Sequence, residues 1–207
     1  LHRDGFSFDI GPSLVTLPHV LDEPFRLAGT SLAEEVDLVR LDPQFRYHWP
    51  DGTRLDVRDD GCDAPGWQEF VARGRRTWEV SERTFFAGPM ERPAQLMRRM
   101  RRPSDLLAID PLRTLHRAAG RHFTDPRLVQ WAGRYATYSG SSPFAAPATL
   151  GCIAHIEAAY GCWHPRGGLG ALRDAFERVA LGAGVVIRCG ADVVAITTRS
   201  APAAARR

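Results

Sequence analysis

At His155-Ile-Glu-Ala-Ala-Tyr-Gly-Cys-Trp-His-Pro-Arg-Gly-Gly-Leu169 the sequence predicts the end of one helix and the start of another. The turn between the two helices is Pro-Arg-Gly-Gly, residues 165–168. Glycine has no Cβ atom, so the backbone at Gly167 and Gly168 can approach a bound group closely. The first turn of the next helix adds unpaired N–H donors and the positive end of the helix dipole. This stretch is therefore a candidate ligand-binding turn.

Helix is expected on both sides of this turn, and strand beyond it. One helix is predicted from 147 to 160, with Gly161 as its stop. After the turn, apolar residues recur three and four apart in a helix that ends at Gly184. The β-branched runs 185–189 and 193–197 then have the composition of strands. The C-terminal part of the chain is thus predicted to pass from helix into strand.

Two strand signals lie nearer the N-terminus. Apolar and polar residues alternate over 6–10 and lead into a Gly-Pro turn at 11–12, which predicts a short strand at one edge of a sheet. An Asp-Gly pair at 51–52 separates the alternating runs 45–49 and 54–58. An Asp-Gly pair between two such runs is the strongest short-range hairpin signal. A β-hairpin is therefore predicted over residues 45–58.

The middle of the chain is predicted to be helical. Large side chains between Trp67 and Trp78 share one helical face, Asp110-Pro111 and Gly120 bracket a second helix, and Asp125-Pro126 opens a third. The order of elements is strand, helical part with a hairpin, helix, strands. This order predicts an α/β fold in which an open layer is interrupted by a mainly helical domain.

Composition narrows the classes of function. The chain has 207 residues, 44% of them hydrophobic, which is enough for one sizeable domain or two small ones. Its formal net charge is only +3 and every basic residue is arginine, without the basic stripe of a nucleic-acid-binding protein, so nucleic acid is set aside as a partner. The cysteines and histidines have no metal-binding spacing, so no metal site is predicted. Reduced thiols and the lack of a long apolar run favour a cytoplasmic protein.

One segment suggests contact with a membrane. Residues 96–102, Leu-Met-Arg-Arg-Met-Arg-Arg, combine soft apolar side chains with cations, as a segment lying on a lipid surface does. An ordinary solvated arginine face over a core stripe explains the same pattern equally well. Peripheral membrane association is therefore one expectation, and no oligomeric state is predicted.

Six segments carry a resemblance to a known family through their order and spacing. They are Gly5–Ser13, Leu41–Arg46 with Asp51–Asp56, Arg134–Pro143, Ala146–Thr149, Pro165–Gly168 and Val193–Ile196. Together they resemble the bacterial phytoene desaturase family of FAD-dependent oxidoreductases, and the resemblance covers nearly all of the chain up to about residue 197. The family's Gly-x-Gly-x-x-Gly loop is expected upstream of the chain and its C-terminal flavin-binding segment downstream, so the chain resembles the middle of a longer enzyme.

The resemblance implies a division into parts. Residues 1–18 and 163–198 are expected in an FAD/NAD(P)-binding, Rossmann-like layer. Residues 19–162, with the hairpin at 45–58, are expected in a mainly helical domain that faces substrate and membrane. Residues 199–207 are expected to be a disordered tail, which looks unlike the family.

The resemblance also implies a chemistry, namely FAD-dependent desaturation of a long isoprenoid hydrocarbon such as phytoene in carotenoid biosynthesis. Val193 is expected near the adenosine part of FAD, and Arg134 and His155 are expected as polar residues near the reacting carbons. The residues expected to face the isoalloxazine ring are Gly11, Pro12, Ser13, Arg166, Gly167 and Gly168.

Several alternatives stay open. A solvated Glu157 and a hydrogen-bonded core His155 would account for that helix without any chemistry, because residues two apart point to different helical faces. Within the family, the alternatives are a related carotenoid desaturase, an oxygenase or a retinol saturase-like enzyme. Outside it, they are an inactive truncated fragment, a lipid-binding module or a flavin-dependent amine oxidase.

Overall fold

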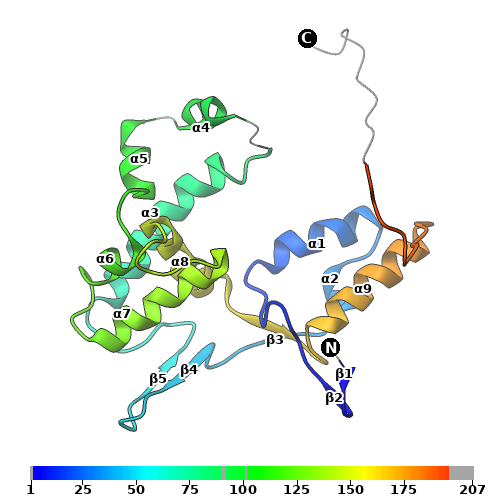
Figure 1. The fold of residues 1–207 in the computed structure, drawn as a ribbon, viewed down its shortest axis with the longest axis horizontal. Helices are drawn as coiled ribbons and strands as arrows, with labels where there is room; N and C mark the ends of the chain where they lie inside the picture. Colours follow the sequence, from blue (N-terminus) through cyan, green and yellow to red (C-terminus); the bar gives the residue numbers. More distant parts are fainter. Residues whose placement is uncertain (1, 90–91, 101, 196–207) are drawn as a thin grey trace.

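The computed structural model describes residues 2–89, 92–100 and 102–195, which form two bodies joined by a short ribbon (Figure 1). The larger body, cyan to yellow, contains most of the helices and the hairpin. The smaller body, blue and orange, contains α1, α2 and α9. The helices are α1 (Pro18–Leu27), α2 (Leu32–Glu35), α3 (Trp67–Thr84), α4 (Pro93–Arg99), α5 (Pro103–Ile109), α6 (Leu115–Ala119), α7 (Pro126–Gly133), η1 (Arg134–Ser139), η2 (Ala148–Gly151), α8 (Cys152–Tyr160) and α9 (Leu169–Gly182).

The core of the larger body is aromatic. Trp131 of α7 is 1% exposed, and its ring lies 4.4 Å from that of Trp67, measured between centroids. The helices α3 and α8 cross closely at Gly74, where a Cβ atom would lie 2.8 Å from the carbonyl oxygen of Gly151. Only glycine allows this approach without a backbone shift. The crossing fixes α8, and with it the residues that α8 carries toward the hairpin.

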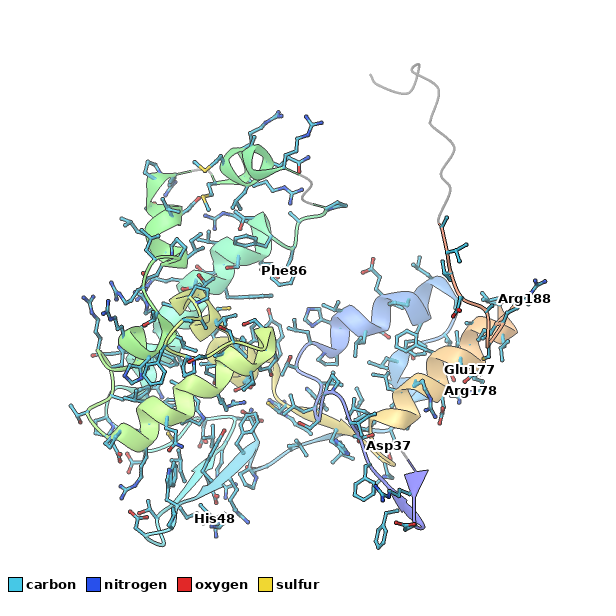
Figure 2. All side chains as sticks on the ribbon, viewed as in Figure 1. Asp37, His48, Phe86, Glu177, Arg178 and Arg188 are labelled. Atoms are coloured by element: carbon cyan, nitrogen blue, oxygen red, sulfur yellow. The ribbon has the colours of Figure 1, made fainter. Side chains whose placement is uncertain are left out.

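The smaller body has its own core, built from Phe25, Leu32, Val36 and Ala175. The rings of Phe25 and Phe176 lie 4.6 Å apart, which joins α1 to α9. On the outside, Arg178 of α9 forms an ion pair with Glu35 of α2 at 2.7 Å, and Figure 2 labels this arginine on the helix. The amphipathic helix predicted after the Pro-Arg-Gly-Gly turn is thus present as α9.

A two-stranded antiparallel ribbon connects the two bodies. Strand β3 (Leu38–Arg40) pairs with β6 (Trp163–Pro165), with Leu38 opposite Pro165 and Arg40 opposite Trp163. The backbone of Val15 bonds to Trp163 in both directions and extends the ribbon. None of these strands was predicted, because three residues are too few for an alternating pattern to be recognised. The ribbon places residues 11–15 beside the turn that follows β6.

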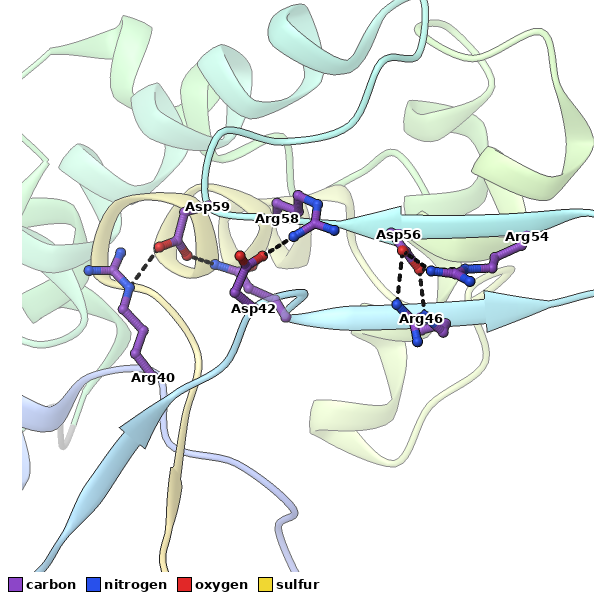
Figure 3. A network of polar contacts seen from close by, with 8 residues as sticks. Arg40, Asp42, Arg46, Arg54, Asp56, Arg58 and Asp59 are labelled. Carbon is purple, nitrogen blue, oxygen red and sulfur yellow. Dashed lines mark hydrogen bonds and ion pairs between the residues drawn. The ribbon is translucent and has the colours of Figure 1, made fainter.

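The hairpin predicted over 45–58 is present as β4 (Phe45–His48) and β5 (Arg54–Val57), with Phe45 opposite Val57. Alternating charges cover its outer face and its base (Figure 3). The ion pairs of this network are Arg46 and Arg54 with Asp56, Arg58 with Asp42, and Arg40 with Asp59. Since the arginines of these pairs are close to half exposed, water screens their charges, and the network mainly fixes the hairpin's orientation.

Two helix boundaries differ from the sequence expectation. Asp110 does not cap a helix that begins at Pro111; it follows α5 in the left-handed region, with φ of 45°, and the next helix, α6, is capped by Thr114. Thr114 caps this helix because its hydroxyl oxygen accepts a hydrogen bond from the backbone N–H of Arg117. Asp125 does cap α7, as predicted. The helix expected over 147–160 is a 3₁₀ turn, η2, followed by α8.

The strands predicted at the C-terminal side are wrong where the structure describes them. Residues 185–195 form no strand, and Val186, Val193 and Val194 are 76%, 81% and 95% exposed. A strand needs a hydrogen-bonding neighbour, and the described part of the chain places none beside this segment. Residues 196–207, including the predicted tail, lie outside the described residues. The Rossmann-like layer therefore stays a prediction; the sheets of the described residues are two-stranded and antiparallel.

Within the described ranges, no helix is both long and apolar enough to cross a bilayer.

Candidate functional site

A pocket of about 480 Å³ opens between the N-terminal segment and η1. It brings together Arg134 and the Gly-Pro-Ser segment, residues that lie more than a hundred positions apart in the sequence. The hairpin contributes one aromatic wall. The lining residues are Gly11, Pro12, Ser13, Leu14, Phe45, Arg134, Thr137 and Tyr138.

The end of α7 positions Arg134. The helix tightens into the 3₁₀ segment η1 after Gly133, and Gly140, with φ of 61°, ends it. The guanidinium of Arg134 stacks on the ring of Phe45, with 3.8 Å from Cζ to the ring centroid. Its side chain is only 20% exposed. Stacking on an aromatic face and burial together hold this cation in one orientation at the pocket wall.

Glu157 of α8 lies behind Arg134. Arg134 Nη2 donates to Glu157 Oε2, and the hydroxyl of Tyr135 donates to the same oxygen at 2.9 Å. The Glu157 side chain is 3% exposed, and its second oxygen, Oε1, has no hydrogen-bond partner, nor has Arg134 Nε. Within the described residues this is therefore a buried, incompletely satisfied ion pair directly under the pocket.

Burial and charge act in opposite directions on this pair. Burial raises the pKa of Glu157, while the charge of Arg134 and the hydrogen bond from Tyr135 partly counter that shift. Burial alone would lower the pKa of Arg134, but the neighbouring Tyr135 and Glu157 outweigh it and raise that pKa above its ordinary value. Arg134 thus stays a cation at every pH at which the protein folds. Burial also raises the pKa of the nearby Cys162 thiol to about 12, so this thiol is not a nucleophile.

The hairpin and α8 are tied together beside this pair. The side-chain amide of Gln44 is 5% exposed and donates both to the Glu157 carbonyl oxygen, at 3.1 Å, and to Asp59 Oδ1, at 2.5 Å. Because Gln44 precedes Phe45, this contact also fixes the ring that stacks on Arg134. The two hydrogen bonds of Gln44 thus join the segment before β4 to α8 and to the segment after β5.

The Pro-Arg-Gly-Gly turn lies next to the N-terminal segment but binds a protein group. Gly167 and Gly168 have φ of 89° and 88°, as expected for such a turn. The backbone N–H of Leu169, at the start of α9, donates to Asp9 Oδ2 at 2.9 Å. The carboxylate of Asp9 thus accepts the hydrogen bond from an N–H group that was predicted to be free for a ligand. Arg166 is largely exposed and forms an ion pair with Asp37 at 2.7 Å, near the end of the ribbon (Figure 2).

Five predicted residues do not line this pocket: Arg166, Gly167 and Gly168 of the turn, together with His155 and Val193. His155 lies on the face of α8 that packs against α3, where its Cβ is 3.3 Å from the position a Cβ would take at Gly74. Burial and the nearby Arg75 lower the pKa of His155, which keeps the ring neutral. Val193 is 81% exposed and has no strand around it. The prediction that His155 and Glu157 point to different faces therefore holds, and Glu157 is the one that meets Arg134.

The sequence expectation missed Glu157 as a partner of Arg134, and missed Asp9, Phe45 and Tyr138. One signal was present: Glu157 is the only charged residue in the otherwise apolar helix Cys152–Tyr160, apart from a histidine. A lone carboxylate among apolar residues is a sign of a buried pair. In the described ranges, no group of three or more His, Cys, Asp or Glu side chains is arranged to hold a metal ion.

The chain is similar to two proteins whose names describe them as oxygenases. It is 30% identical to 4,4'-diapolycopene oxygenase of Methylomonas sp, over 98% of this chain and 43% of that protein. It is also 30% identical to 4,4'-diaponeurosporene oxygenase of Staphylococcus aureus, strain USA300, over 94% of this chain and 42% of that protein. No family model matches the chain. The chain thus spans less than half the length of the curated relatives that it matches.

Proposed function

We infer that this chain is part of a flavin-dependent oxidoreductase of carotenoid biosynthesis that acts on a long polyene. The observation that carries this proposal is the pocket itself. Two segments singled out by the family resemblance, around Gly11–Ser13 and Arg134, line one cavity. The similarity to two carotenoid oxygenases over nearly the whole chain supports the same substrate class.

The residues around the pocket fit the edge of an FAD molecule. A Cβ atom at Gly11 would meet nothing within 4 Å, so the backbone there is open to a flat ring. Residues 11–13 and Arg134 would hold that ring, and the turn at 165–168 would support residues 11–13 through Asp9. Bound FAD would supply the acceptor for hydrogen that no protein side chain provides. The phosphate loop of a dinucleotide site has no counterpart in the sequence of this chain.

The chain's own residues would bind, orient and exclude water. Arg134 presents a permanent positive charge at a fixed place, which stabilises negative charge that develops in the pocket during oxidation. Phe45, Leu14 and Tyr138 offer apolar surface that suits a hydrocarbon chain and displaces water from it. No general base of this chain is needed for this role, which agrees with the position of His155 outside the pocket.

Oxygenation and desaturation are the two candidate outcomes. The names of the relatives favour oxygenation, and the order of motifs, which resembles phytoene desaturases, favours desaturation. The test is to supply the intact protein with 4,4'-diapolycopene and, separately, with phytoene, and to analyse products by mass spectrometry. With FAD present and dioxygen as the source of oxygen, we expect oxygen to be added to 4,4'-diapolycopene. Loss of hydrogen from phytoene without added oxygen would assign desaturation instead, and no product from either polyene would contradict the redox function.

The position of the Pro-Arg-Gly-Gly turn makes a separate prediction. Replacing Gly168 by valine in the intact protein should remove most of the bound flavin. A Cβ at Gly168 would lie 2.9 Å from Asp9 Oδ2, and φ of 88° strains any residue with a side chain by about 1–3 kcal/mol. The Asp9 carboxylate must therefore shift away from the N–H of Leu169, which loosens the contact that holds residues 11–13 beside the turn. Flavin absorbance per protein measures the loss.

A matched control for this variant is Gly170→Ala. Gly170 lies in the first turn of the same helix, and a Cβ there would meet nothing within 4 Å. It should leave the flavin content unchanged. If Gly168→Val retains flavin as well as Gly170→Ala does, the turn does not support the flavin.

A further inference from the structure

A second, larger pocket lies on the outer side of the helical body, away from Arg134. It is open and has a volume of about 680 Å³. Three arginines line it at every fourth position, which places them on one side of the chain around α6. Its lining residues are Asp110, Leu112, Arg113, His116, Arg117, Gly120 and Arg121.

The charge of this pocket is not balanced within the chain. Asp110 is its one acidic residue, and that carboxylate is shared by Arg113, at 3.5 Å, and by Arg73 of α3, at 2.5 Å. Arg117 and Arg121 form no ion pair with any described residue, and both are exposed. Two guanidinium groups are therefore free to bind an anion, and guanidinium is the side-chain group best matched to phosphate oxygens.

The backbone that carries these side chains is rigid. Leu115, at the start of α6, is fully buried, and its N–H donates to the Ala146 carbonyl oxygen at 2.8 Å. The Arg113 carbonyl oxygen accepts from the N–H of Ala148 at 2.8 Å, and the His116 ring packs against the ring of Phe144, with centroids 4.4 Å apart. A fixed platform lowers the entropy lost when the arginines hold a ligand.

One exposed leucine lies in the pocket with the cations, and another lies on the helix that precedes it. Leu112, in the pocket, is 97% exposed, and Leu107 of the neighbouring α5 is 79% exposed. Free phosphate would make no contact with exposed leucines that stabilises its binding. The headgroup phosphate of a lipid, in contrast, lies directly above an apolar layer that such leucines can enter. We propose that the pocket around Arg117 and Arg121 binds the headgroup phosphate of an anionic membrane lipid, while Leu112 and Leu107 enter the acyl region.

The test is co-sedimentation of the intact protein with phosphatidylcholine vesicles that contain, or lack, phosphatidylglycerol. The double variant R117Q/R121Q should bind the anionic vesicles about 30-fold more weakly, which follows from ~1 kcal/mol per arginine near an anionic surface. The charge-matched control is R98Q/R102Q, which removes two exposed arginines from the segment 96–102. It should change the affinity by less than about threefold.

Each other outcome overturns a part of the proposal. An equal loss of vesicle affinity in both double variants would mean that net charge alone attracts the vesicles. A larger loss of affinity in R98Q/R102Q would show that the segment 96–102 makes the contact instead. The variant Leu112→Ser separates lipid from free phosphate. It should weaken vesicle binding but leave binding of inorganic phosphate, measured by calorimetry, as in the parent; unchanged vesicle binding would rule out a lipid as the ligand.

Discussion

Replacing Arg134 by methionine is expected to lower the free energy of unfolding by about 3–5 kcal/mol. Methionine is apolar but shorter than arginine, so it fills only part of the pocket wall, and the carboxylate of Glu157 is left in the interior with its ion-pair partner removed. Its side chain is 3% exposed, and one of its oxygens already has no hydrogen bond. The cost thus comes from an isolated buried charge. Urea denaturation followed by circular dichroism measures it.

The double variant R134M/E157Q is the control for this interpretation. Glutamine keeps the shape of Glu157 and can still accept the hydrogen bond from Tyr135, without the charge. The double variant should therefore recover most of the stability that R134M loses. If it is as unstable as R134M, the cost arises from lost packing around Arg134, including its stacking on Phe45, and not from the unpaired carboxylate.

The pH dependence of R134M provides a second readout with a definite sign. The pKa of Glu157 in the folded protein is raised above 4.5, and Arg134 partly counters that rise. A raised carboxyl pKa means that the folded state takes up the proton first, so this group's contribution to stability grows as the pH falls through its folded-state pKa and is lost as the pH rises through it. Without Arg134 the folded-state pKa rises further. R134M should therefore regain stability more steeply than the parent as the pH falls toward 4.5, the ordinary pKa of a glutamate, and R134M/E157Q should not.

Local signals predicted most of the elements around the site. The Asp-Gly hairpin, the Asp125 cap of α7 and the stop of α8 at Gly161 are each set by one or two residues, whose backbone preferences act whatever the surroundings are. The family resemblance also selected Arg134 and Gly11–Ser13 before any geometry was known. Arg134 and Gly11–Ser13 could be selected because each lies in a short continuous motif that can be recognised without knowing the fold.

What could not be predicted depends on contacts between distant segments. The ribbon of β3 and β6 pairs residues more than a hundred positions apart, and neither strand is long enough to have a pattern. A solvated Glu157 was one of the alternatives left open, because nothing in the sequence relates this residue to Arg134. The opposite error occurred at 185–189, where β-branched composition was not sufficient because a strand also needs a neighbour.

Replacing Trp131 by alanine is expected to destabilise the helical body by about 3–5 kcal/mol. Its ring is 1% exposed and lies against the rings of Trp67, Phe70, Phe123 and Tyr135. No small rearrangement fills the space that an indole leaves among four fixed aromatic rings. Urea denaturation followed by far-ultraviolet circular dichroism measures the loss, because this signal does not depend on the removed tryptophan.

Trp131→Phe distinguishes packing from hydrogen bonding. The indole N–H of Trp131 is buried and has no hydrogen-bond partner in the described structure, so phenylalanine gives up no hydrogen bond and should cost less than about 2 kcal/mol. Leu112→Ala, at a fully exposed site, should stay within about 0.5 kcal/mol. Equal losses of stability in the alanine and phenylalanine variants would contradict the packing argument.

Because Trp131 also packs against Tyr135, whose hydroxyl donates a hydrogen bond to Glu157, the alanine variant should disturb the pocket wall as well as the core. On the proposed function, the flavin content of the intact protein should then fall together with its stability.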